Sequence, residues 1–243
     1  SYTDLAGNAG TVETTANYEV ETLAPTVSSV EITSGTGMMN YFLNASDADG
    51  RDVVSATVIF RESVILDNAN GNPTLTLVVG STDQTATYTP DDNSTILVFQ
   101  YTIQAGENDT DGISIGANAL LPNGLTIRDA AGNYATNLTH DSVTHNSSFK
   151  VDTTPPTIST VGITGEDGIQ NNFLNEGDNV SVTVTFSENV SVTGTPQLTL
   201  AVGEDNHTAD YTSSGSGATT TKVFKYTIQA GDNDTDGISI GAN

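Results

Sequence analysis

A long internal repeat limits the possible folds of this chain more than any other sequence feature. Residues 101–118 read YTIQAGENDTDGISIGAN, and residues 226–243 read YTIQAGDNDTDGISIGAN. The two segments begin 125 residues apart and differ at one position, where Glu107 is replaced by Asp232. Such self-similarity is typical of chains that build one structural module several times. We therefore expect tandem copies of a single module.

Two shorter repeats indicate where the modules begin and end. Residues 4–8 (DLAGN) recur at 129–133 (DAAGN), and residues 20–26 (VETLAPT) recur at 151–157 (VDTTPPT). The sequence therefore predicts three parts. They are the C-terminal strands of a preceding module (1–22), a complete module (23–153), and a module lacking its last strands (154–243).

The complementary ends have two interpretations. In the first, the chain is an excerpt of a longer tandem array. In the second, residues 1–22 complete the open module 154–243 of a neighbouring subunit, as in donor-strand complementation, and the chain assembles head to tail into an extracellular fibre. Both interpretations make neighbouring modules or neighbouring subunits the expected partners.

The apolar runs are short and rich in threonine and β-branched residues, which favours strands over helices. Alternation of apolar and polar side chains gives each strand one inward face. About seven short strands in each module predict an antiparallel, Ig-like β-sandwich. The paired prolines of residues 151–156 (VDTTPP) predict a short, semi-rigid linker between modules. The predicted strands include residues 53–60, 74–79, 86–89, 96–103, 180–186 and 198–202.

The composition excludes several partners and sites. With 6 Lys and Arg against 30 Asp and Glu, the net charge is −24. This charge argues against nucleic acid and anionic membranes, which bind through basic residues. The chain has no cysteine, so it can form neither disulfides nor thiolate metal sites. No apolar run is long enough for direct membrane insertion. The excess of carboxylates favours divalent cations as ligands.

The carboxylates recur at matching places in the repeats. An Asp-x-Asp-Gly loop in each long repeat can offer several oxygens to a hard cation such as Ca²⁺. A Glu also follows an inward-facing Phe where a strand leaves the sheet, and an acidic residue precedes each linker. The predicted calcium ligands are Asp109 and Asp111, their equivalents Asp234 and Asp236, the post-strand Glu62 and Glu188, Asp129, and the linker acids Glu21 and Asp152.

Simple sandwich topology predicts which of these acids meet. We expect Glu62 and Asp129 to lie near Glu21, and Glu188 near Asp152, so that calcium would lock two modules at a fixed angle. The competing interpretation is structural, because Asp and Asn side chains bond to nearby backbone in turns. The charge favours metal, since clustered carboxylates repel one another without a cation.

The sequence gives weaker signals for other kinds of chemistry. His140 and His145 lack a helical context, so a solvated loop is favoured over a zinc site. Residues 47–50 (DADG) are a third acidic loop or a plain turn. The chain has no Gly-x-Ser-x-Gly elbow, and its acids lie in Gly- and Asn-rich loops, so no enzymatic activity is predicted. A glycan- or protein-binding module is a further alternative, weakened for glycans by the absence of Trp.

Several motifs together resemble a known class of bacterial protein. They are residues 186–190 (FSENV), 194–203 (GTPQLTLAVG), 226–243, 129–133 and 151–157. The pattern resembles the Ig-like tandem repeats of very large secreted surface adhesins of the RTX and swimming-motility types. The resemblance implies an extracellular, calcium-binding extender that projects an adhesive tip for cell adhesion and biofilm formation. The first module departs from the pattern at residues 60–63 (FRES), where Arg61 can compete with a cation.

Overall fold

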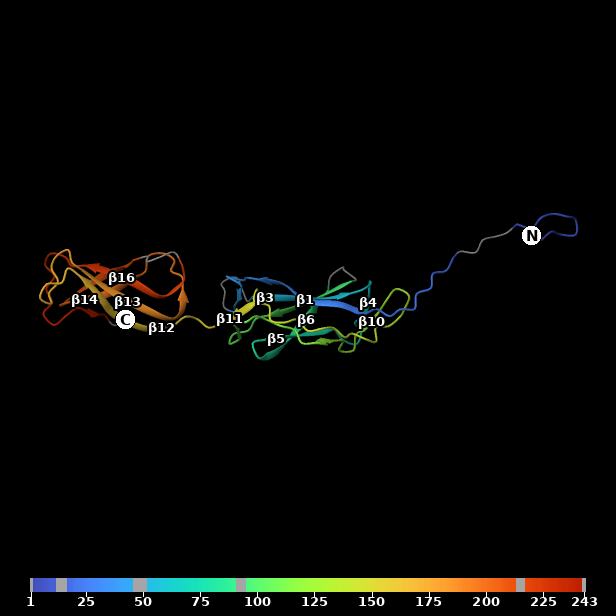
Figure 1. Ribbon diagram of the computed structural model, residues 1–243, viewed down its shortest axis with the longest axis horizontal. Coiled ribbons are helices and arrows are strands. Elements are labelled where there is room, and N and C mark those ends of the chain that lie inside the picture. Colours follow the sequence, from blue (N-terminus) through green and yellow to red (C-terminus); the bar gives the residue numbers. More distant parts are fainter. Residues whose placement is uncertain (1, 12–16, 46–51, 91–94, 213–216, 242–243) are drawn as a thin grey trace. The chain divides into compact units, whose positions relative to one another are not determined.

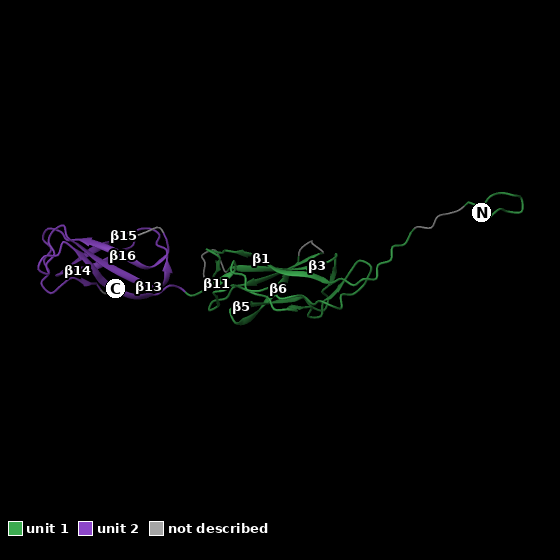
Figure 2. Ribbon diagram, viewed as in Figure 1, with its two compact units in different colours: residues 1–154 green, residues 155–243 purple. Residues whose placement is uncertain are grey.

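The computed structural model describes residues 2–11, 17–45, 52–90, 95–212 and 217–241. These residues form strands, turns and loops without any helix, which confirms the predicted all-β class. The chain divides into two compact units, which we call unit 1 (Ser1–Thr154) and unit 2 (Pro155–Asn243) (Figure 2). Within the described ranges there is no helix of the length and apolarity needed to cross a membrane.

Unit 1 is built on a six-stranded antiparallel sheet, in which the strands follow the order β1-β3-β7-β6-β5-β9 (Figure 1). Several of its strands coincide with predicted ones. The bounds are β1 Val27–Thr36, β3 Val53–Phe60, β5 Thr74–Val79, β6 Thr82–Thr89, β7 Ile96–Thr102 and β9 Leu120–Leu121.

Two smaller sheets bring distant parts of unit 1 together. Strand β4 (Ile65–Asp67) pairs with β10 (Thr126–Arg128). Strand β11 (Lys150–Asp152) lies between β2 (Phe42–Leu43), to which it is parallel, and β8 (Asn108–Asp109), to which it is antiparallel. The C-terminal part of the unit is therefore held by strands from its beginning and its middle.

The core of unit 1 follows the alternation of its strands. In β3, the side chains of Val54, Val58 and Phe60 are buried, because successive residues on a strand point to opposite faces. The small sheets contribute Ile127 from β10 and Val151 from β11 to the same core. Several sheets thus enclose one apolar interior, which is an arrangement of the β-sandwich type.

Unit 2 repeats this architecture with fewer elements. Its sheet has the strand order β12-β13-β16-β15-β14-β17, and the first five of these strands match β1-β3-β7-β6-β5 of unit 1. The sixth, β17, corresponds to the segment at Ser114, which forms an isolated bridge with Val78 in unit 1. Its core contains fewer buried residues, drawn mainly from β13, β14 and β16. The bounds are β12 Ile158–Asp167, β13 Asn179–Val190, β14 Gln197–Val202, β15 Asp205–Thr212, β16 Thr219–Thr227 and β17 Ser239–Ile240.

The repeat extends to the register of the strands. Val27 is opposite Phe60 in unit 1, and Ile158 is opposite Phe186 in unit 2. Each of these strand pairs has two irregularities, and they occur at equivalent places, after the first residue of the pair and again five residues later. The sequence repeat is therefore a repeat of topology and of register.

Candidate metal centre

Asp109 lies in β8 and ties two loops of unit 1 together. Its side chain is buried, and one oxygen accepts a hydrogen bond of 2.7 Å from the amide of Gly80 in the β5–β6 turn. The other oxygen accepts a hydrogen bond of 2.7 Å from the amide of Gly112. Both glycines have positive φ angles, of 61° and 105°, which side chains with a Cβ rarely adopt. Asp109 thus stabilises two tight turns.

Asp109, Asp111 and His145 form the candidate metal centre. Each offers a ligand atom, and these atoms all lie within 4.8 Å of one another; no other such group of three occurs in the part of the chain that the structure describes. Asp109 is buried, whereas the side chains of Asp111 and His145 are 66% and 50% exposed. Two carboxylates and an imidazole are donors that can hold a divalent cation.

His145 reaches this group from a distant part of the sequence. Its Nδ1 lies 3.0 Å from the carbonyl oxygen of Gly112 and 3.5 Å from Asp111 Oδ2. Backbone hydrogen bonds position its loop, because the amide of Ile113 donates to Phe149 and the amide of Asn146 donates to Ile113. The sequence placed His145 in a solvated loop, and only the pairing of these segments brings it to Asp111.

The equivalent loop of unit 2 has the same backbone anchoring. Asp234 accepts hydrogen bonds from the amides of Gly203, at 2.9 Å, and Gly237, at 2.7 Å. These amides hold the pKa of Asp234 below its ordinary value. Asp236 is exposed, and its amide donates to Asp234 at 3.1 Å. Residues 155–243 match unit 1 only as far as Asn118, so the comparison of the two units does not extend to His145.

Asp129 has the hydrogen bonds of a turn residue. It accepts bonds of 2.8 and 2.7 Å from the amide and side chain of Asn133, and these hold its pKa below the ordinary value. The side chain of Asn133 also donates to the carbonyl oxygen of Glu21 at 3.3 Å. The predicted approach of the linker to the Asp129 loop is thus made by the backbone of Glu21.

The remaining predicted ligands do not join a group of three among the described residues. Glu62 and Glu188 are half-buried, but Glu62 lies just past the end of β3, whereas Glu188 lies within β13. Asp152 accepts a hydrogen bond of 3.0 Å from the amide of Thr154. Asp152 belongs to unit 1 and Glu188 to unit 2. The acidic loop of residues 47–50 lies outside the described residues.

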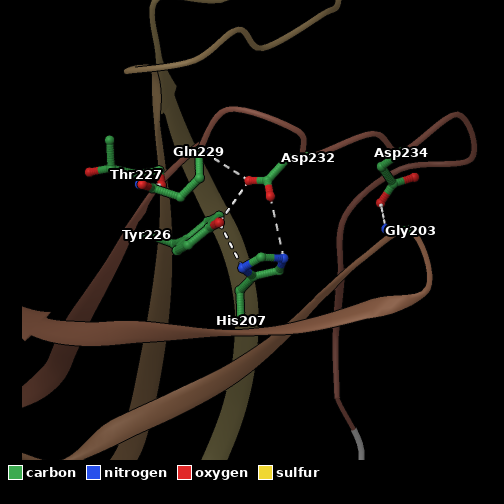
Figure 3. A network of polar contacts seen from close by, with 7 residues as sticks. All are labelled: Gly203, His207, Tyr226, Thr227, Gln229, Asp232 and Asp234. Atoms are coloured by element: carbon green, nitrogen blue, oxygen red, sulfur yellow. Dashed lines mark hydrogen bonds and ion pairs between the residues drawn. The ribbon is translucent and has the colours of Figure 1, made fainter.

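Unit 2 also contains a polar network that the sequence did not predict (Figure 3). The hydroxyl of Tyr226 lies 2.8 Å from His207 Nδ1 and donates to Asp232 Oδ2 at 2.7 Å. His207 Nε2 lies 3.4 Å from Asp232 Oδ1, and the amide of Gln229 donates to Asp232 Oδ2 at 2.8 Å. Burial, followed by the hydrogen bond to Asp232 and its charge, raises the pKa of Tyr226.

The carboxylate of Asp232 is stabilised in its charged form. Burial alone would raise the pKa of Asp232, but the Gln229 amide, the Tyr226 hydroxyl and His207 outweigh it and lower that pKa below its ordinary value. In unit 1, the hydroxyl of Tyr101 and the amide of Gln104 donate to Glu107 in the same way. The difference is the histidine, because Gln84 stands at the position of His207.

Comparison of the whole chain with known proteins finds no relative. No family model, no curated protein and no solved structure matches it.

Proposed function

We propose that this chain is a structural extender from the stalk of a bacterial cell-surface adhesin, located outside the cell. The observation that carries the proposal is the repeat of strand order and register in units 1 and 2. Repeated modules of this kind suit a spacer, because each added copy lengthens the array without new chemistry. The acidic loops support the same role, since their carboxylates bind backbone amides and hold turns.

We further propose that calcium stiffens the array at the Asp109–Asp111–His145 centre. The loop that carries this centre also holds the start of the linker. The amide of Thr153 donates to Asn108 at 3.1 Å, and its hydroxyl donates to the carbonyl of Glu107 at 2.9 Å. A cation bound here would restrain the residues that fix the direction of the linker. The net charge of −24 favours cation binding.

The choice of calcium has one opposing feature. Calcium takes six to eight oxygen ligands, which here would come from carboxylates, backbone carbonyls and water. His145 adds a nitrogen, which suits zinc and other transition metals better. Calorimetric titration should therefore compare Ca²⁺, Mg²⁺ and Zn²⁺ on the same protein. We expect Ca²⁺ to bind and to raise the melting temperature, because a ligand that binds the folded state stabilises it by mass action.

Matched variants make this experiment specific. Asp111 is exposed, so Asp111→Asn removes a proposed ligand without disturbing the core. Asp83→Asn, at an exposed position of β6, changes the charge equally and is the control. The calcium effect on the melting temperature should shrink in the first variant and persist in the second. Equal effects in both would place the metal elsewhere, and no calcium uptake by wild-type protein would refute the metal proposal.

The stalk proposal predicts a mechanical consequence. If calcium stiffens the linker, small-angle scattering of the chain should show a narrower range of end-to-end distances with calcium than with chelator. The Asp111→Asn variant should give the chelator profile in both conditions. Identical profiles of wild-type protein in both conditions would leave a spacer whose stiffness does not depend on calcium.

A further inference from the structure

The three histidines of the chain differ in what contacts their rings. Nδ1 of His145 lies near a carbonyl and a carboxylate oxygen, which can only accept hydrogen bonds. Nδ1 of His207 lies 2.8 Å from the hydroxyl of Tyr226, which can donate or accept. In the part of the chain that the structure describes, His140 is the one histidine whose ring accepts a hydrogen bond from a backbone amide. Its ring therefore responds to protonation differently from the other two.

Two contacts fix the protonation state of His140. Its Nε2 accepts a hydrogen bond of 3.3 Å from the amide of Leu120, and its Nδ1 lies 2.8 Å from the carbonyl oxygen of Asp141. A backbone amide can only donate a hydrogen bond, and a carbonyl oxygen can only accept one. Nδ1 therefore carries the proton and Nε2 carries none, so the two contacts together require the neutral imidazole.

The Leu120 amide lies at a junction between segments of unit 1. Leu120 is in β9, where it is opposite Leu75 of β5, and it is buried. Just before β9, the amide of Asn118 donates to the carbonyl of His140 at 3.2 Å, and the amide of His140 donates to Asn118 Oδ1 at 3.1 Å. The segment that contains β9 is thus bonded to β5 and to the segment around His140, and the His140 ring is one of these links.

Protonation of the His140 ring is incompatible with this link. A protonated imidazole carries N–H groups on both nitrogens, so Nε2 would face the Leu120 amide as a second donor. Histidine exchanges its ring proton between about pH 5 and pH 8. The hydrogen bond from Leu120 is therefore lost in mild acid, at pH values where exposed Asp and Glu side chains keep their charge.

The segments bonded to one another at this ring carry little charge that could oppose the effect. Residues 113–125, β5 and residues 135–144 contain one titratable side chain besides His140, that of Asp141. Asp141 is exposed, and an exposed carboxylate favours a charged imidazole only weakly, since water and salt screen the attraction. The loss of the acceptor for the Leu120 amide therefore dominates the result of protonation.

We propose that His140 is an acid-sensitive clasp of unit 1. The neutral ring holds β9 to the segment around His140, and the protonated ring releases the Leu120 amide. Stability from this hydrogen bond is present while the ring is neutral, and it is lost as the pH falls through the range in which the folded protein takes up the proton. Release loosens the edge of the core, where Ala119 and Leu120 are buried. The clasp does not depend on the metal centre or on the stalk function.

Amide hydrogen exchange of the full chain measures the clasp, and chelator removes any contribution from a bound cation. After correction for the intrinsic effect of pH, the protection of the Leu120 amide should fall about fivefold between about pH 8 and pH 5, which corresponds to the loss of one ordinary hydrogen bond. The Val78 amide, which donates to the carbonyl of Ser114 at 2.8 Å, should keep its protection and is the internal control. Unchanged protection of Leu120, or an equal loss at Val78, overturns the proposal.

Matched variants assign the response to one ring. His140→Phe keeps an aromatic ring but has no acceptor, so the Leu120 amide should show the low protection at both pH values. His207→Phe removes the histidine of unit 2 and should leave the response of Leu120 as it is in the wild-type chain. A response that persists in the first variant, or disappears in the second, contradicts the clasp. The wild-type measurement decides the question even where His140→Phe does not fold.

A further variant separates the lost hydrogen bond from the neighbouring charge. Asp141→Asn removes the carboxylate but keeps the backbone carbonyl that Nδ1 contacts. It should move the midpoint of the response to lower pH and leave its size unchanged, because a carboxylate favours the charged ring. Loss of the response in this variant means that Asp141 drives it, which overturns the clasp. Nitrogen NMR should also show Nε2 of His140 without a proton at about pH 8, and a proton on Nε2 there overturns the assigned tautomer.

Discussion

Units 1 and 2 have the same sheet but different degrees of closure. The order of the first five strands, the register and the positions of the irregularities agree, so the repeated segments carry the pattern of the sheet. Burial does not agree, because residues 119–154 pack against the core of unit 1, whereas the described residues of unit 2 match unit 1 only over the part before Asn118. Local pattern thus determines the sheet, whereas closure depends on a segment that is distant in sequence.

The largest expected difference between the units is the stability lost when one core leucine is truncated. This leucine is Leu43 beside β11 in unit 1 and Leu174 in unit 2. Leu43→Ala should destabilise unit 1 by about 2–5 kcal/mol, because it leaves a cavity in a closed core. Leu174→Ala should cost unit 2 about 1 kcal/mol, because that side chain is half-buried and borders an open cavity of about 220 Å³. Native-state hydrogen exchange measures the two units separately in one protein. Equal costs would mean that this cavity of unit 2 is closed in solution.

A smaller difference in stability is expected for the aspartate of each unit that accepts hydrogen bonds from two turn amides. Asp109→Ala should cost unit 1 about 1–3 kcal/mol, because it leaves the amides of Gly80 and Gly112 without their acceptor in a buried site. Asp234→Ala should cost unit 2 less than half as much, since water can reach the equivalent amides. The same exchange experiment, run in chelator, separates this effect from metal binding. A larger loss in unit 2 would contradict the comparison.

The sequence predicted strands where the alternation is regular and missed them where it is not. Residues 53–60 and 74–79 were predicted with the bounds that β3 and β5 have. Strands β1 and β12 were not among the predicted strands, because irregularities after Val27 and Ile32, and at the equivalent places of β12, interrupt the period-two pattern. Strands β10 and β11 have three residues each and exist only through their partners.

The candidate site shows the same limit. The Asp-x-Asp-Gly loop was visible in the sequence because its residues are adjacent. His145 follows Asp111 by 34 positions, and only the fold places its ring beside that loop. The anchoring of Asp109 by Gly80 is equally a contact between distant segments, 29 residues apart. Sequence patterns identified the ligand types, whereas the three-dimensional pairing selected which of them meet.

The smallest expected effect is a pH dependence of unit 2. The pKa of Asp232 is lowered from its ordinary value of 3.8 in the folded state, so its carboxylate stabilises unit 2 above that pH. The stability is lost as the pH falls from about 4 through the lower folded pKa. In urea unfolding between pH 6 and pH 2, Asp232→Asn should remove part of this acid sensitivity.

The control for this effect is Asp210→Asn, which changes an exposed carboxylate on β15 of the same unit. Asp210 accepts a hydrogen bond from Gln197, but it lies outside the His207–Tyr226–Asp232 network. Its variant should keep the acid sensitivity of the wild-type unit. If both variants flatten the pH profile equally, net charge repulsion at the acidic surface governs the acid response. If only Asp232→Asn does so, the response arises from the His207–Tyr226–Asp232 network of unit 2.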